Sequence, residues 1–221
     1  VWDADNNKFL DYLMALGPII LGYNNARVNE AIAKQLKDGP VFSQMHPLEV
    51  EVAELLVDII PCADMVRFGK TGTDATSGAV RAARAYTGRD RIAVCGYHGW
   101  QDWYIGTTTR SLGIPQSARD LSHTFLYNDL TSLSNLFDEF PDEFAAVIME
   151  PMGVEEPEDG FLEGVKSACQ ANGALLVFDE IVSGFRLALG GAQEIFGVKP
   201  DLACFGKGMA NGMPLSAIVG R

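Results

Sequence analysis

Residues 174–180 of the chain read Ala-Leu-Leu-Val-Phe-Asp-Glu, so that five apolar side chains end abruptly at two carboxylates. Residues 145–151, Ala-Ala-Val-Ile-Met-Glu-Pro, have the same layout. A short, continuous apolar run is typical of a strand that is buried on both faces, as strands of a parallel sheet are. We therefore predict strands over 144–149 and 174–178, each followed by an acidic side chain.

Similar elements lie on both sides of these two strands. Short apolar runs predict further strands at 64–68, 91–95 and 202–205. Apolar residues three and four positions apart predict helices at 26–37, 47–60, 74–87, 129–139 and 160–172. Repeated strand-then-helix units indicate an α/β fold, a mostly parallel sheet that is flanked by helices. In such sheets, ligands bind beyond the carboxyl ends of the strands.

The domain organisation follows from where this pattern begins. We expect one large α/β domain over 47–221, preceded by a segment over 1–46 that starts with a hairpin and belongs to a smaller lobe. Val1 stands in place of an initiating Met, and Arg221 directly follows the strand-like run 215–219. We therefore expect a piece of a longer protein in which the large domain is incomplete.

The composition excludes several classes of protein. The chain has 221 residues, of which 48% are hydrophobic and 21% charged, which is typical of a globular protein and not of a disordered one. Its 17 Lys+Arg against 29 Asp+Glu give a net charge of -12, the wrong sign for a protein that binds nucleic acid through phosphates. No run approaches the ~18 apolar residues of a membrane helix, so we expect no membrane partner.

The cysteines and histidines predict no metal site. The chain has 4 cysteines without a C-x-x-C pair and 3 histidines without ligand spacing. Cysteines without such a pattern are typical of reduced thiols in a cytoplasmic protein, and cytoplasmic is the location that we expect. They are Cys62, Cys95, Cys169 and Cys204.

Residues 69–75, Gly-Lys-Thr-Gly-Thr-Asp-Ala, stand between a predicted strand and a predicted helix. Glycine lets backbone N–H groups approach an anion, and the helix N-terminus adds a partial positive charge. The stretch is therefore a candidate phosphate site around Gly72 and Thr73. It is not a P-loop, because Asp64 stands where that motif needs glycine. A helix N-cap in a turn explains the same residues equally well.

Tyr97, His98 and Trp100 follow the strand at 91–95. An aromatic side chain at the carboxyl end of a strand can stack on a planar ligand, and it can equally cap the core from a loop. His98 is a candidate acid or base, although a lone histidine more often orients a neighbouring group.

Three further side chains at strand ends are candidates for chemistry. Glu150 and Asp179 follow buried strands, where a carboxylate needs a cationic or hydrogen-bonding partner. Together they fit an acid/base pair for hydrolysis, and either one fits the counter-ion of a protonated ring nitrogen. Lys207 lies between Gly206 and Gly208 after the strand at 202–205, and a buried lysine becomes a nucleophile toward carbonyls.

A phosphate site, a stacking aromatic, an acid for a ring nitrogen and a Schiff-base lysine are the four parts that a pyridoxal 5′-phosphate site requires. In this respect the chain resembles the class III (fold type I) pyridoxal-phosphate-dependent aminotransferases, close to the glutamate-1-semialdehyde aminomutase-like branch. The ordered set of motifs carries the resemblance. They are Asp11-Tyr12 with 17–22 (Gly-Pro-Ile-Ile-Leu-Gly), 71–75 (Thr-Gly-Thr-Asp-Ala), Tyr97-His98-Gly99, Glu150-Pro151, Phe178-Asp179-Glu180-Ile181, Gly184-Phe185-Arg186 and Gly206-Lys207-Gly208.

The resemblance implies a role for each matching residue. Lys207 and Asp179 are the implied catalytic residues, Lys207 as the Schiff-base lysine and then as the base that moves a proton, Asp179 as the partner of the pyridine nitrogen. The implied cofactor-binding residues are Gly72 and Thr73 at the phosphate, Tyr97 and Ile181 on the two ring faces, Glu150 near Asp179, and His98, together with Asp179 and Lys207. The resemblance also implies a homodimer. It further implies a C-terminal lobe, and we expect this chain to lack that lobe.

The implied function is transfer of an amino group from an amino donor to a keto or aldehyde acceptor. Two alternatives stay open: an aminomutase that moves the amino group within one molecule, and a non-catalytic binding protein on the same fold. Glu155 favours the aminotransferase, because the aminomutases usually have asparagine at this position. The substrate is not predicted; Leu16, Gln44 and Trp100 are candidate neighbours of the substrate pocket.

Overall fold

The computed structural model describes residues 1–221 and contains one seven-stranded sheet in the order β1-β7-β6-β5-β4-β2-β3. Among β2 to β6, every pair of neighbouring strands is parallel. Strand β7 runs antiparallel to both of its neighbours, β6 and β1. The strands are β1 (Met65–Gly69), β2 (Arg91–Cys95), β3 (Ser122–Thr124), β4 (Phe144–Met149), β5 (Leu175–Asp179), β6 (Leu202–Phe205) and β7 (Ser216–Gly220).

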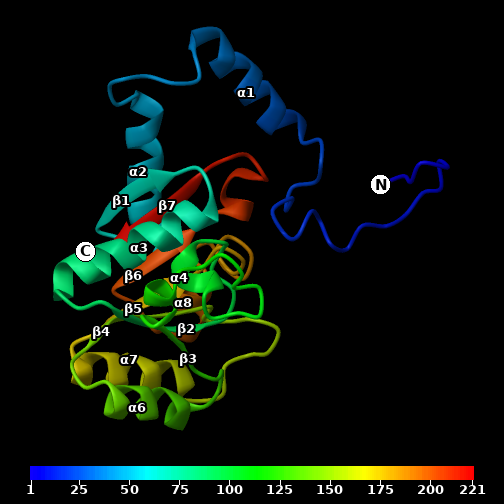
Figure 1. The fold of residues 1–221 in the computed structure, drawn as a ribbon. Coiled ribbons are helices and arrows are strands. Elements are labelled where there is room, and N and C mark those ends of the chain that lie inside the picture. Colours follow the sequence, from blue (N-terminus) through cyan, green and yellow to red (C-terminus); the bar gives the residue numbers. More distant parts are fainter.

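Helices cover both faces of the sheet (Figure 1). Helix α3 (Gly72–Thr87) packs on one face, and α2 (Pro47–Ile59), α6 (Leu130–Glu139) and α7 (Phe161–Asn172) contribute to the core on the other. Helix α1 (Ala26–Asp38) lies outside these layers and has no buried residue. The remaining short helices are α4 (Asp102–Ile105), α5 (Gln116–Arg119), α8 (Ala192–Phe196) and the 3-10 helix η1 (Lys207–Ala210).

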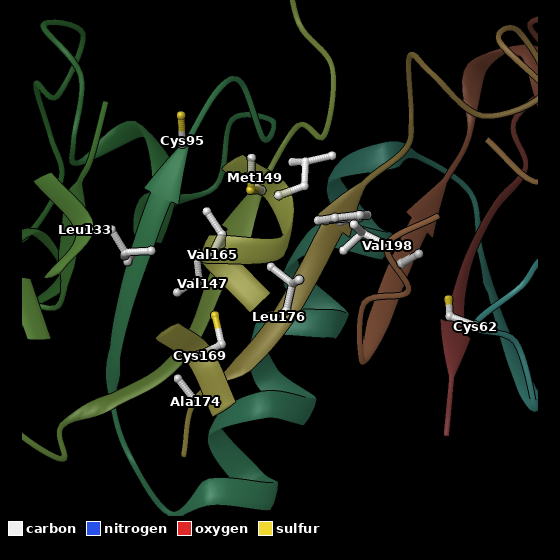
Figure 2. Packing of buried hydrophobic residues seen from close by; sticks show 14 of the residues in the cluster. Cys62, Cys95, Leu133, Val147, Met149, Val165, Cys169, Ala174, Leu176 and Val198 are labelled. Carbon is white, nitrogen blue, oxygen red and sulfur yellow. The ribbon is translucent and has the colours of Figure 1, made fainter. Parts of the chain in front are cut away.

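The central strands are apolar throughout because successive side chains point to opposite faces and both faces are covered. In β4, Val147 and Met149 belong to the cluster beneath α6 and α7, while Ala146 and Ile148 belong to the cluster beneath α3. Figure 2 shows the first cluster, in which Cys169 of α7 points toward the sheet. Each central strand is thereby fixed in register, since a shift by one residue would exchange its two faces.

Most of the predicted elements are confirmed. The five predicted strands are β1, β2, β4, β5 and β6, and the five predicted helices are α1, α2, α3, α6 and α7, with ends that differ by at most two residues. The run at 215–219 forms β7. The N-terminal hairpin is reduced to a single antiparallel bridge between Trp2 and Lys8.

Four short helices and β3 were not predicted. Strand β3, Ser-His-Thr, is polar and lies at the edge of the sheet, where no second covering layer demands an apolar run. The division into a lobe at 1–46 and a domain at 47–221 stays a prediction. None of the helices is both long and apolar enough to cross a membrane.

Candidate active site

The carboxyl ends of β4, β5 and β6 meet at one edge of the sheet because these strands are parallel neighbours. The edge holds a cavity of about 240 Å³. All eight residues that the sequence predicted for the site line it, together with four others. The lining residues are Thr71, Gly72, Thr73, Tyr97, His98, Gly99, Trp100, Glu150, Asp179, Ile181, Val182 and Lys207.

One end of the cavity is the N-terminus of α3. Thr71 Oγ1 accepts a hydrogen bond from Asp74 N at 3.2 Å, and Asp74 Oδ2 accepts one from Thr71 N at 2.8 Å, which forms a capping box. The hydrogen bond that its carboxylate accepts from the Thr71 backbone lowers the pKa of Asp74. Gly72 and Thr73 are the first two residues of the helix, so their N–H groups have no partner within it. This end of the cavity is suited to an anion.

Gly99 closes the wall beside this helix terminus. Its φ of 108° belongs to the left-handed half of the backbone map, and a Cβ at this position would collide with Thr73 Oγ1. Only glycine therefore lets the loop after β2 approach Thr73 so closely.

Asp179 and His98 form a buried pair beneath the cavity. His98 Nδ1 lies 2.8 Å from Asp179 Oδ2, and the two side chains are 0% and 4% exposed. Asp179 Oδ1 accepts a hydrogen bond from Ile181 N at 3.1 Å. His98 Nε2 is buried without a partner. A buried lone pair without a partner costs less than a buried N–H without one, so the proton of a neutral ring belongs on Nδ1, which donates to Asp179.

Glu150 borders the cavity beside Asp179. Its Oε2 accepts a hydrogen bond from Tyr97 N at 2.9 Å. Burial, with a further contribution from the charge of Asp179, raises the pKa of Glu150. Tyr97 is 61% exposed and lines the cavity, which leaves its ring available for stacking on a planar group.

Lys207 directly follows β6 by way of Gly206 and begins η1. Its side chain forms no ion pair, although Asp179 and Glu150 line the same cavity. The amine is therefore free of a fixed carboxylate partner. This is the arrangement that a nucleophilic or proton-carrying lysine needs.

The segment after Asp179 is held by a second buried acid, Glu180. Its carboxylate accepts hydrogen bonds from Ala192 N and Gln193 N, both at 2.9 Å, and from the Ser183 hydroxyl. Burial raises the pKa of Glu180. Glu180 follows the same apolar run as Asp179 but was not among the residues predicted for the site.

Only one of the three predicted neighbours of the substrate pocket lies at the cavity. Trp100 lines the cavity, whereas Leu16 and Gln44 do not. Both of these residues lie in the N-terminal 46 residues, of which none is buried. Thr71 and Val182 also line the cavity. Thr71 stands within the predicted phosphate stretch 69–75 but was given no role of its own. Val182 was not predicted, and its position next to Ile181 was the only signal in the sequence that could have identified it.

Comparisons with known proteins agree with this geometry. The family model described as aminotransferase class-III matches residues 1–221. A 3-aminobutyryl-CoA aminotransferase of Cloacimonas acidaminovorans is 43% identical to the chain and a glutamate-1-semialdehyde 2,1-aminomutase of Acetivibrio thermocellus is also 43% identical; both similarities cover 100% of the chain. They cover 54% and 55% of those two proteins, so the chain spans about half the length of the curated relatives it matches.

Solved structures show the same relationship. An omega-transaminase from Sphaerobacter thermophilus matches with a TM-score of 0.92 at 34% identity, over 100% of the chain and 55% of the transaminase. The FumI protein of Sphingopyxis sp. MTA144, in its PLP internal aldimine form, matches with a TM-score of 0.90 at 36% identity, over 99% of the chain and 54% of that protein.

Proposed function

Because this chain belongs to the class III aminotransferase family, we propose that the whole protein is a pyridoxal-phosphate-dependent aminotransferase. It moves an amino group from an amino donor to a keto or aldehyde acceptor. The observation that carries the proposal is the amine of Lys207, which has no ion-pair partner and shares one cavity with Asp179 and the N-terminus of α3.

The cavity fits pyridoxal phosphate in its donor set. The cofactor has a phosphate at one end, a planar ring and a ring nitrogen. The free N–H groups of Gly72 and Thr73 suit the phosphate, and the exposed face of Tyr97 suits the ring. Asp179 is a buried carboxylate with few partners, which suits a protonated nitrogen. When bound, pyridoxal phosphate supplies an aldehyde that carries the amino group and a ring that accepts electrons.

Two residues complete the proposed binding set. Ile181 would contact the second face of the ring, and its N–H donates a hydrogen bond to Asp179, which links the two residues. Glu150 would lie beside the ring when the cofactor is bound, because it lines the cavity together with Asp179. His98 is proposed to act through Asp179: its Nδ1–H holds Oδ2 and leaves the remaining lone pairs of the carboxylate facing the cavity.

Lys207 is the proposed reactive group. Its Nζ would be the amine that holds the cofactor through its aldehyde when pyridoxal phosphate is bound. When it is not engaged in this way, the same Nζ would serve as the base that holds and moves a proton at the α-carbon of the substrate.

The proposed assembly is a homodimer, and the proposed location is the cytoplasm. The exposed apolar side chains of residues 1–46 support the proposal of a homodimer, because they offer a surface that a second copy could cover. The four buried cysteines form no disulfide, which supports a reducing compartment.

An aminomutase is a second candidate, supported by the 43% identity to glutamate-1-semialdehyde 2,1-aminomutases. The two functions differ in stoichiometry. An aminotransferase consumes an external amino donor and releases its keto product, whereas an aminomutase isomerises one substrate. Turnover that depends on an added donor, with release of one keto acid per amine formed, favours the aminotransferase.

The experiment that tests the proposal is reduction of the full-length protein with borohydride after pyridoxal phosphate is added, followed by peptide mapping. We expect the reduced adduct on Lys207. Lys70 is the internal control, because it precedes Thr71 in the chain but does not line the cavity. Lys207→Ala should abolish the adduct and the donor-dependent activity while leaving the unfolding transition intact. Adducts on Lys70 or scattered lysines, with none on Lys207, would favour the non-catalytic binding protein.

A further inference from the structure

Residues 17–22 lie against the loop that carries Lys207. Ile20 packs over Gly208, where a Cβ would lie 3.2 Å from Ile20 Cδ1. Ile19 packs over Gly212, where a Cβ would lie 2.7 Å from Ile19 Cδ1. Because the two glycines have no side chains, two isoleucines of the N-terminal segment can pack directly on the loop backbone.

Asn211 fastens this contact with its side chain. Asn211 Oδ1 accepts a hydrogen bond from Leu21 N at 2.8 Å, and Asn211 Nδ2 donates one to Gly22 O at 3.0 Å. The residue has φ 48° and ψ 41°, a left-handed conformation that asparagine adopts more readily than most residues. A single amide therefore satisfies a backbone donor and a backbone acceptor of the distant segment.

The backbone of the same loop closes back on Lys207. The N–H of Asn211 bonds to the carbonyls of Gly208 and Lys207, and Gly212 N bonds to Lys207 O at 3.3 Å. Lys207 itself has φ 43°. A residue with a Cβ is held in this region only when its surroundings determine it, so the position of Lys207 depends on the loop that follows it.

We infer that Asn211 is a positioning residue for Lys207: it fastens segment 17–22 to loop 207–212 and thereby fixes where the Lys207 amine lies in the cavity. This inference rests on the proposed function for the role of the amine. The tie itself, meaning the two side-chain hydrogen bonds from Asn211 to Leu21 and Gly22, is independent of that function. Segment 17–22 has another tie at Gly17, whose carbonyl accepts a hydrogen bond from Arg186, so the segment bridges the chain after Asp179 and the chain after Lys207.

Amide hydrogen exchange of the full-length protein, without added cofactor, tests the tie. Asn211→Gly permits the left-handed backbone and removes only the two side-chain bonds. We expect the exchange of Leu21 N–H, and of the bonded amides Met209 and Gly212, to rise at least about tenfold, the effect of losing a hydrogen bond. Unchanged exchange at Met209 and Gly212 while Leu21 becomes exposed would overturn the inference, because the tie would then leave the Lys207 loop unaffected.

A second readout follows the amine. In borohydride trapping with pyridoxal phosphate, the ratio of adduct on Lys207 to adduct on Lys70 should fall about tenfold in Asn211→Gly. Asn211→Asp keeps the acceptor for Leu21 N and should recover part of the ratio. A lower unfolding temperature with an unchanged ratio would make Asn211 merely structural and overturn the inference. Absence of the adduct in the unsubstituted protein would instead overturn the proposed function, and hydrogen exchange would still test the tie.

Asn128 provides a matched control. It has φ 59°, accepts a hydrogen bond from Glu158 N at 2.9 Å and donates one to Glu156 O at 3.2 Å, so it ties a different segment in the same way. Asn128→Gly should leave exchange at 207–212 and the labelling ratio unchanged. A change equal to that of Asn211→Gly would show a general loosening and overturn the specific role. The double substitution Ile19→Ala/Ile20→Ala should loosen 207–212 without altering any residue of that loop.

Discussion

At the scale of single residues, the buried pair of His98 and Asp179 depends on hydrogen bonding more than on packing. His98→Asn keeps a donor near the position of Nδ1 but leaves part of the ring volume empty, whereas His98→Leu fills the volume and removes the donor. We predict that His98→Leu lowers the free energy of unfolding by about 2 kcal/mol, because a buried carboxylate loses a charge-assisted bond. His98→Asn should cost less. Urea unfolding measures both, and a greater loss in His98→Asn would contradict the assignment.

Glu150 gives a pH-dependent prediction. Burial raises its pKa in the folded state, so the protonated carboxyl stabilises the fold below the ordinary pKa of glutamate, and this stability is lost as pH rises through the folded pKa. Glu150→Gln stays neutral and can still accept from Tyr97 N. Without cofactor, we predict equal unfolding temperatures near pH 4 and a variant that is more stable by roughly 2 °C at pH 8.

The exposed carboxylate of Glu155 provides the control for this measurement. Glu155→Gln removes the same charge five positions further along the chain without relieving burial, so its unfolding temperature should follow that of the unsubstituted protein from pH 4 to 8. If both variants gained stability equally, net charge and not the burial of Glu150 would be the cause.

The identities of the site residues could be predicted from sequence because each stands at the end of an apolar run, where a parallel sheet places it at one edge. Lys207, Asp179 and Glu150 were found in this way. The pairing of His98 with Asp179 could not be predicted, since Asp179 lies 81 positions away and only the fold brings their atoms together. Asn211 was missed for the same reason, because its partners Leu21 and Gly22 come from the N-terminal segment.

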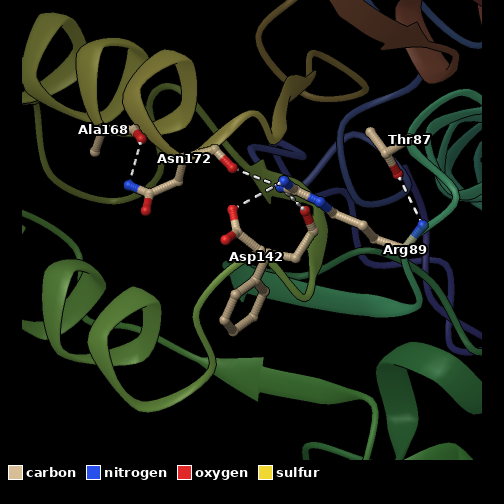
Figure 3. A network of polar contacts seen from close by, with 6 residues as sticks. Thr87, Arg89, Asp142, Ala168 and Asn172 are labelled. Carbon is tan, nitrogen blue, oxygen red and sulfur yellow. Dashed lines mark hydrogen bonds and ion pairs between the residues drawn. The ribbon is translucent and has the colours of Figure 1, made fainter.

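At the scale of elements, Arg89 joins three parts of the fold (Figure 3). It lies between α3 and β2, donates to the carbonyls of Phe144 and Asn172, and pairs with Asp142 at 3.2 Å. The guanidinium side chain is 22% exposed, whereas Asp142 is 85% exposed. The bonds to the carbonyls at the start of β4 and the end of α7 therefore contribute more than the ion pair.

This difference predicts unequal effects of two substitutions. Arg89→Gln should lower the free energy of unfolding by about 2 kcal/mol, because two half-buried carbonyls lose their donor. Asp142→Asn should lower it by less than about 0.5 kcal/mol. Urea unfolding at low and high salt measures both, and the Arg89 effect should persist in salt. An Arg89 effect that disappears at high salt would mean that the ion pair dominates.

Strands that are buried on both faces could be predicted from the sequence. Elements whose ends are fixed by tertiary contacts could not. Strands β4 and β5 are buried on both faces, and their apolar runs are too short for a helix of ordinary length. Helix α8, by contrast, has five residues and begins where Glu180 accepts from Ala192 N and Gln193 N. Its start is fixed by a side chain 12 positions earlier, which no local period reveals.

At the scale of the whole molecule, the N-terminal segment is held by few contacts. No residue before Leu56 is buried, and Figure 1 shows the first residues extending away from the sheet. Apolar side chains are nevertheless frequent there, including Leu10 at 78% and Tyr12 at 87% exposure. Large contiguous apolar surfaces mark interaction sites in monomeric proteins. The segment thus has the composition of an element that is buried against another surface.

We predict that a second copy supplies this surface, so that the full-length protein sediments as a homodimer. Replacing Leu10 and Tyr12 together by Asp should raise the dimer dissociation constant at least tenfold, because two charges would have to be desolvated in the interface. Leu112→Asp is the control: Leu112 is 97% exposed but lies in the loop between α4 and α5, outside the segment, and should stay dimeric. Sedimentation velocity over a concentration series measures the constant. A monomeric unsubstituted protein, or equal weakening by Leu112→Asp, would contradict the prediction, since the apolar side chains of residues 1–46 would then not form the interface between copies.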